Sequence, residues 1–133
     1  MTEIQALLLI KSILESADIH GIESFLAEDC EYMSTGRGII GRNRNETIEF
    51  LSSMAESIKA DNVPVTCKVM HITDVYEEDA LFREGRHGLT VSYESGDNYV
   101  YMIFVDVNDE GLVDRIVSSQ ENYSIEYDDL RFS

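Results

Sequence analysis

The sequence predicts an α+β fold in which helices come first and a curved antiparallel sheet follows. Apolar residues recur at three-to-four spacing up to about residue 62 and at every second position from residue 63 onward. Short turn-forming stretches separate the later segments, which is typical of an antiparallel meander. The 133 residues, 44% of them hydrophobic, suit a single domain spanning 1–133.

A first helix is expected to begin at Thr2, which forms a capping-box pattern with Gln5. The helix should end at Asp18–Gly21, and residues 22–26 carry a second, short helical stretch. The apolar positions of the first helix share one broad face, which should be buried: Ile4, Leu7, Leu8, Ile10, Ile13, Leu14 and Ala17.

A short strand over 30–34 and another helix should follow. Three glycines between residues 36 and 41 predict a flexible loop that joins the strand to the helix. Asn43, with Glu46 three positions later, is expected to cap this helix, which should end near 59–62.

Four long strands should complete the chain, beginning at Val63 and continuing over 80–93, 98–107 and 112–123. The strand 98–107 is apolar on both faces, so both faces need cover. No helix remains for the outer face, and a homodimer through that face is therefore predicted. The acidic segment 124–133 is expected either to fray or to fold over the edge of the sheet.

The charge is strongly acidic, with 26 acidic and 10 basic residues and a formal net charge of -16. The resulting field repels phosphate backbones and anionic lipids, so neither nucleic acid nor a membrane is a predicted partner. Two interpretations of the charge stay open: solubility, or an acidic face for a basic protein partner. The first residues show no secretion or membrane-spanning pattern, and a cytoplasmic location is expected.

The two cysteines, Cys30 and Cys67, lack Cys-x-x-Cys spacing and are expected to be buried free thiols. Cys67 and His71 lie four apart on a strand, roughly 13 Å from end to end, which is too far for one zinc ion. Phosphate-loop, serine-hydrolase and zinc-protease motifs do not occur in the sequence. Neither a metal nor a cofactor is predicted.

Candidate ligand-binding groups follow from the alternation within strands. Tyr32 and Ser34 share one face of the short strand and should lie near a pocket mouth, unless Tyr32 is a core residue bonded to backbone. Tyr101 adds a possible hydrogen-bond donor from the apolar strand.

His71 is expected on an inward strand face, as either an acid–base group or a partly buried imidazole. Arg83 and His87 share the parity of Leu89 and are assigned to the inward face. There Arg83 could hold a carboxylate through two hydrogen bonds, the alternative being an exposed arginine among acidic neighbours.

Three of the ten basic residues, Arg37, Arg42 and Arg44, precede the predicted helix N-terminus. Backbone N–H groups at such a terminus favour anions. The cluster either binds an anion or pairs with nearby carboxylates.

The order of elements resembles the nuclear-transport-factor-2-like superfamily, which includes SnoaL-like and ketosteroid-isomerase-like proteins. The resemblance is carried by the runs at 25–32, 41–42 and 48–51, which read Phe-Leu-Ala-Glu-Asp-Cys-Glu-Tyr, Gly-Arg and Ile-Glu-Phe-Leu. It implies a cone with a pocket between sheet and helices, and dimers through the outer sheet face. Fold alone does not carry chemistry.

The isomerase comparison places the general base five residues after the position of Asp29, which is Ser34 in this chain. A serine hydroxyl cannot take a proton from carbon at neutral pH without a strong base beside it. The tyrosine that the isomerases carry in the first helix is also missing from residues 2–17. Steroid-type isomerase chemistry is therefore disfavoured.

The leading hypothesis is a SnoaL-like pocket protein for a lipophilic ligand with a carbonyl or carboxylate. In its enzymatic form, a lyase or isomerase, His71 or His87 would serve as acid–base and Tyr32 or Tyr101 as hydrogen-bond donor. One alternative is a non-enzymatic acidic partner-binding protein, such as an immunity protein or accessory subunit. The other is a filled cone without a ligand.

Overall fold

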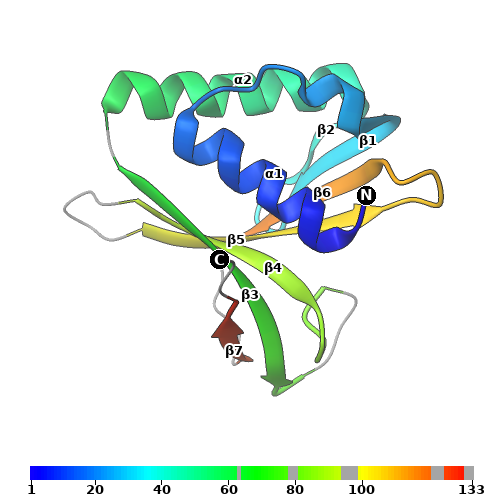
Figure 1. Cartoon of the computed structure of the whole chain (residues 1–133), viewed down its shortest axis with the longest axis vertical. Helices are drawn as coiled ribbons and strands as arrows, with labels where there is room; N and C mark the ends of the chain where they lie inside the picture. Colours follow the sequence, from blue (N-terminus) through cyan, green and yellow to red (C-terminus); the bar gives the residue numbers. More distant parts are fainter. Residues whose placement is uncertain (63, 78–80, 94–98, 121–124, 131–133) are drawn as a thin grey trace.

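Two helices lie on one side of a curved seven-stranded sheet (Figure 1). This computed structural model describes residues 1–62, 64–77, 81–93, 99–120 and 125–130. The elements along the chain are α1 (Glu3–Ser16), the 3-10 helix η1 (Ile22–Phe25), β1 (Leu26–Ser34), β2 (Gly38–Gly41), α2 (Arg44–Asp61), β3 (Val65–Val75), β4 (His87–Tyr93), β5 (Tyr99–Val107), β6 (Val113–Ser119) and β7 (Ile125–Asp129).

Both helices begin at the predicted caps. The Gln5 N–H donates to Thr2 Oγ1 at 3.2 Å, and the Thr2 N–H donates to Gln5 Oε1 at 2.9 Å, so the capping box is complete. At the start of α2, the Glu46 N–H donates to Asn43 Oδ1 at 3.0 Å. These bonds pair N–H groups that have no partner within the helix itself.

The strand order is β2-β1-β6-β5-β4-β3-β7. The predicted meander is confirmed, since β3 to β6 pair antiparallel with their neighbours. In contrast, β1 lies parallel to β6, with Ser34 opposite Ser118, so the sheet is mixed rather than wholly antiparallel. The alternation of residues within β1 does not indicate which strand pairs with it, because β1 and β6 are far apart in the sequence.

Several boundaries differ from the predictions. The glycine-rich loop is a hairpin, because Gly38 turns the chain with φ 82° and β2 returns antiparallel to β1. β1 begins at Leu26 rather than at residue 30, and β4 begins only at His87. Residues 125–129 form β7 against β3, which makes the fold-over alternative right for them. The parts of the predicted strands and tail at 63, 80, 98, 121–124 and 131–133 lie outside the described residues.

The main core fills the space between α1, α2 and the concave face of the sheet. α1 contributes the predicted apolar face, of which Leu7, Ile10, Ile13 and Leu14 are buried. Further buried members from the sheet and α2 include Tyr32, Leu51, Cys67, Val69, Leu89, Val91, Ile103 and Ile116.

A second apolar cluster covers the opposite face of the sheet. Met102 and Phe104 of β5 are buried there against Phe82, whose ring lies edge-on to Phe104 with centroids 5.4 Å apart. The Arg86 guanidinium lies 5.3 Å from the Phe104 ring centre. The connection before β4 thus supplies cover on this face, where the sequence predicts a second copy of the chain. The homodimer stays a prediction.

Side chains of α1 cover the outer edge of β3 at Cys67, next to the segment from Met70 to Val75 that pairs with β7. Lys11 Nζ donates to the Cys67 carbonyl oxygen at 2.8 Å, and the Cys67 N–H donates to Glu15 Oε2 at 3.1 Å. Lys11 and Glu15 also form an ion pair at 2.9 Å. The N–H and the carbonyl oxygen of Cys67, which face away from β4 at this edge, therefore have hydrogen-bond partners on a helix.

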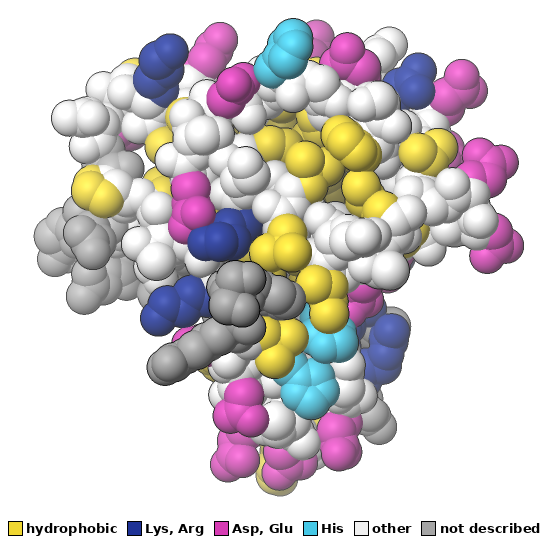
Figure 2. Space-filling model, in the orientation of Figure 1, with side chains coloured by type: hydrophobic (Ala, Val, Ile, Leu, Met, Phe, Trp, Pro, Cys, Tyr) yellow, Lys and Arg dark blue, Asp and Glu magenta, His cyan; other side chains and the backbone are white. Residues whose placement is uncertain are grey.

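Figure 2 shows the face of the molecule that carries α1. Hydrophobic side chains form a band through the centre of this face, and most of the acidic side chains lie toward its periphery, with lysines and arginines among them. Within the described ranges, neither helix combines the length and the apolar character that a membrane span requires.

Gly41 is required for close packing rather than for a turn. A Cβ at this position would lie 2.8 Å from Thr47 Oγ1 and 2.9 Å from the Thr47 backbone nitrogen. We predict that Gly41→Ala lowers the free energy of unfolding by about 1–3 kcal/mol, measured by urea denaturation. Gly36→Ala is the control, since its Cβ would meet no atom within 4 Å. Equal stability of the two variants would contradict this account of Gly41.

The Glu15 contacts predict a dependence of stability on pH. Burial by itself raises the pKa of Glu15, but the hydrogen bonds from Lys11 and Cys67 and the charge of Lys11 outweigh it and leave the pKa lowered. The stabilisation is therefore present above the ordinary pKa of 4.5 and is lost as the pH falls through the lower folded value.

Glu15→Gln should accordingly cost at most about 1 kcal/mol at pH 7, because the ion pair is partly exposed. The difference from the wild type should shrink below pH 4.5. Urea denaturation at pH 7 to 3 measures it, with the exposed Glu56→Gln as control. A difference that grows on acidification would refute the assignment.

Candidate functional site

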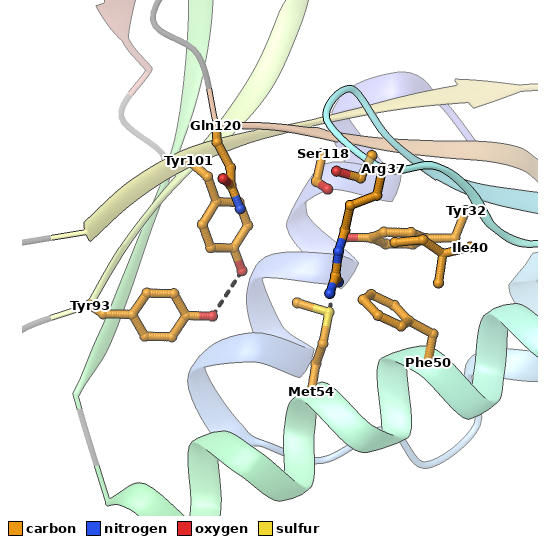
Figure 3. Close-up of a pocket in the computed structure, with 10 residues that line it drawn as sticks. Tyr32, Arg37, Ile40, Phe50, Met54, Tyr93, Tyr101, Ser118 and Gln120 are labelled. Atoms are coloured by element: carbon orange, nitrogen blue, oxygen red, sulfur yellow. Dashed lines mark hydrogen bonds between the residues drawn. The ribbon is translucent and has the colours of Figure 1, made fainter.

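A cavity of about 160 Å³ lies between the curved sheet and α2 (Figure 3). Its walls come from β1, the β1–β2 turn, β2, α2, β4, β5 and β6 together with the residue that follows β6. The described residues that line it are Tyr32, Ser34, Arg37, Ile40, Phe50, Met54, Tyr93, Tyr101, Ser118 and Gln120.

The hydroxyls of β1 reach this cavity because the strand alternates. Cys30, Tyr32 and Ser34 are buried on the inward face, whereas Met33 between them is only partly buried. The parallel pairing with β6 then brings Ser118 beside Ser34.

Tyr32 lies against the apolar wall that α2 provides. Its ring packs on Phe50 with centroids 4.5 Å apart, and its hydroxyl is 4.0 Å from Met54 Sδ. Burial raises the pKa of Tyr32, an effect that the Ser118 hydroxyl partly offsets. The phenol therefore stays protonated at neutral pH.

Tyr93 and Tyr101 form a hydrogen-bonded pair on the side of the cavity opposite Tyr32 and Phe50 (Figure 3). Their hydroxyl oxygens are 3.0 Å apart. Burial raises the pKa of Tyr101, and the hydrogen bond with Tyr93 raises it further. Like Tyr32, Tyr101 is a hydrogen-bonding group rather than a base.

The rim of the cavity carries the exposed side chains of Arg37 and Gln120. Arg37 lies on the β1–β2 turn, where its N–H donates to the Ser34 carbonyl at 3.2 Å. From this turn its guanidinium extends into the pocket beside Met54 (Figure 3).

Three of the six candidate residues, Tyr32, Ser34 and Tyr101, line this cavity, and their ligand-binding role stays a prediction. His71 and His87 lie elsewhere, opposite each other on β3 and β4, with ring centroids 5.2 Å apart. His87 contacts α1, because its Nδ1 is 3.2 Å from Glu3 Oε1.

Arg83 is exposed and does not line the cavity, so its assignment to the inward face is wrong. The alternation that paired it with His87 fails because residues 81–86 form turns rather than strand. The buried arginine of this connection is Arg86, whose Nη2 donates to Asp106 Oδ1 at 3.2 Å.

The other lining residues show how much depends on tertiary structure. Arg37 belongs to the arginine cluster, Phe50 to the run that carries the family resemblance, and Tyr93 shares the parity of His87. These patterns could have identified them. Ile40 and Ser118 reach the cavity through the pairings of β2 and β6, which no local pattern in the sequence indicates.

The arginine cluster is divided by the fold. Arg37 joins the cavity, whereas Arg44 lines a separate hollow of about 240 Å³ at the start of α2 with Glu28, Asn43 and Asn45. Glu28 supplies a carboxylate to the lining of that hollow, and both interpretations of the cluster stay predictions.

The cysteines are free and buried, as predicted. Burial raises the pKa of Cys30 and of Cys67 to about 12, and nearby carboxylates add to the effect at both sites. Neither thiol is a nucleophile at neutral pH. The described part of the chain also contains no group of three or more residues placed to hold a metal ion.

The cavity therefore combines an apolar wall with neutral hydroxyls, one amide and one guanidinium. None of the described lining residues is an aspartate, a glutamate or a histidine. Such a surface can bind and orient a small molecule, but it offers no group that exchanges a proton readily at neutral pH.

Comparison with known proteins identifies the fold. The sequence matches no protein-family model and no curated protein. Similar solved structures include an NTF2-like protein of unknown function from Mesorhizobium loti, with a TM-score of 0.59, 14% identity and coverage of 90% of this chain and 91% of that one.

Two further similar structures are enzymes. An LEH-like epoxide hydrolase from M. tuberculosis has a TM-score of 0.55 at 18% identity, covering 90% of this chain and 82% of that one. A steroid delta-isomerase from Pseudomonas aeruginosa has a TM-score of 0.57 at 13% identity, covering 90% and 80%. The chain thus has the NTF2-like α+β cone fold, which confirms the predicted fold class.

Proposed function

We propose that the protein binds one small organic molecule inside the cone, between the tyrosine pair and the apolar wall of α2. The observation that carries this proposal is the cavity itself, which is about the size of the roughly 150 Å³ cavity known to bind benzene in an engineered protein. A single ring with one polar substituent fits such a space.

The lining favours a flat ligand that accepts hydrogen bonds. Phe50 and Met54 offer ring and thioether contacts on one side, and Tyr93 and Tyr101 hold hydroxyls on the other. A SnoaL-like pocket protein of this kind agrees with the fold, since two similar structures are named as an epoxide hydrolase and a steroid delta-isomerase.

Binding is proposed here in place of acid–base catalysis. A lyase or isomerase needs a group that takes up and returns a proton within hydrogen-bond reach of the substrate. Burial keeps Tyr32 and Tyr101 protonated, and the two histidines predicted for this role lie on β3 and β4 outside the described lining.

A second candidate function is the binding of a basic protein, which the exposed surface of β7 favours. Glu126, Asp128 and Asp129 are all exposed on this strand, which forms one edge of the described sheet. The chain as a whole has a net charge of -16. Its negative field and these exposed carboxylates are complementary to a basic partner.

Methyl NMR of methionine-labelled protein tests the pocket. Phenol or benzamide should shift the Met54 methyl signal, with a Kd of the order of millimolar for so few atoms. Met70 and Met102 serve as internal controls, because they are buried on the opposite face of the sheet. Ile40→Trp should fill the cavity and abolish the Met54 shift while the control signals stay in place. An unmoved Met54 signal in the wild type rejects the proposal.

Native mass spectrometry of the protein from its own host separates the two candidates. A small added mass that Ile40→Trp removes is expected for the pocket. A stoichiometric complex with a basic protein, weakened by added salt, is expected for the acidic edge. A complex that is insensitive to salt would count against the charge argument.

A further inference from the structure

We infer that the pocket selects small carboxylates and that Arg37 is the residue that selects them. This inference rests on the proposed function and specifies its ligand class. In this inference Arg37 holds the ligand carboxylate, a role for which the sequence pattern indicated Arg83.

Arg37 is placed to meet a ligand at the mouth of the cavity. It follows β1 directly, and the turn is held by the bond from its own N–H to the Ser34 carbonyl oxygen. The guanidinium extends toward Met54, on the side of Tyr32 and Phe50 and across the cavity from the tyrosine pair (Figure 3). A molecule bound between the two walls would therefore lie next to the guanidinium.

The charge of Arg37 is not satisfied by the described protein. None of the described carboxylates forms an ion pair with it, although acidic residues outnumber basic ones 26 to 10 in the chain. The described lining contains hydroxyls and an amide but no carboxylate that would compete for the guanidinium. A ligand carboxylate can take both parallel hydrogen bonds of this group.

The overall negative charge does not prevent this selection. At physiological ionic strength the screening length is about 8 Å, so distant carboxylates act weakly on the pocket. Among the described lining residues the charged group is the Arg37 guanidinium, which is positive. The surrounding field should slow the entry of an anion more than it weakens the bound state.

Benzoate and benzamide form a matched pair for the test, because they share shape and size and differ in charge. We expect the wild type to bind benzoate about tenfold more tightly than benzamide, measured by titration of the Met54 methyl signal. Raising NaCl from 0.05 to 0.5 M should weaken benzoate binding and leave benzamide binding unchanged.

Arg37→Gln should remove the preference, so that benzoate and benzamide bind with equal affinity. Arg42→Gln is the matched control, since Arg42 is an exposed neighbour that does not line the cavity. It should keep the preference.

The outcomes separate this inference from the proposed function. Equal affinity of the wild type for both probes, or a benzoate preference that survives Arg37→Gln, overturns the role of Arg37 and leaves the pocket standing. A Met54 signal that moves with neither probe overturns the pocket and this inference together.

Discussion

The parallel pairing of β1 with β6 is the constraint on which the rest of the structure depends. It attaches the first strand, its hairpin partner β2 and the helix α2 to the meander formed later in the chain. Without it, the wall containing Tyr32 would have no fixed relation to the tyrosines of β4 and β5. The pocket is therefore a product of long-range pairing. Folding has to close this loop before any ligand site exists.

The two faces of the sheet are covered by different means. The concave face packs against both helices, and the buried side of α1 supplies much of that core. On the opposite face, Phe82 and Arg86 come from a connection without regular structure and cover Phe104. The described apolar residues of β5, for which the sequence predicts cover by a second copy of the chain, are thus buried within one copy. The sequence showed correctly that cover was needed but not where it came from.

Local chemistry explains which features could be predicted. The caps at Thr2 and Asn43 and the alternation of β3 depend on residues within a few positions, and all are found as expected. The same alternation misled at Arg83, because parity has meaning only while the chain remains a strand. The partners of β2 and β7 depend on residues far away in sequence. Half of the candidate residues lie outside the cavity although the fold class is correct: Arg83 lies in a turn, and His71 and His87 lie on parts of β3 and β4 that do not line it.

The closed outer edge of β3 has a consequence for the solubility of the protein. α1 side chains bond to Cys67, the Leu130 N–H donates to the Val69 carbonyl at 2.8 Å, and β7 pairs with the strand from Met70 onward. The new edge is β7, on which carboxylates replace the apolar side chains of β3. A second copy adding itself in register there would bring like charges together, which resists edge-to-edge aggregation. The like charges on β7 therefore disfavour the addition of a further strand at this edge of the described sheet.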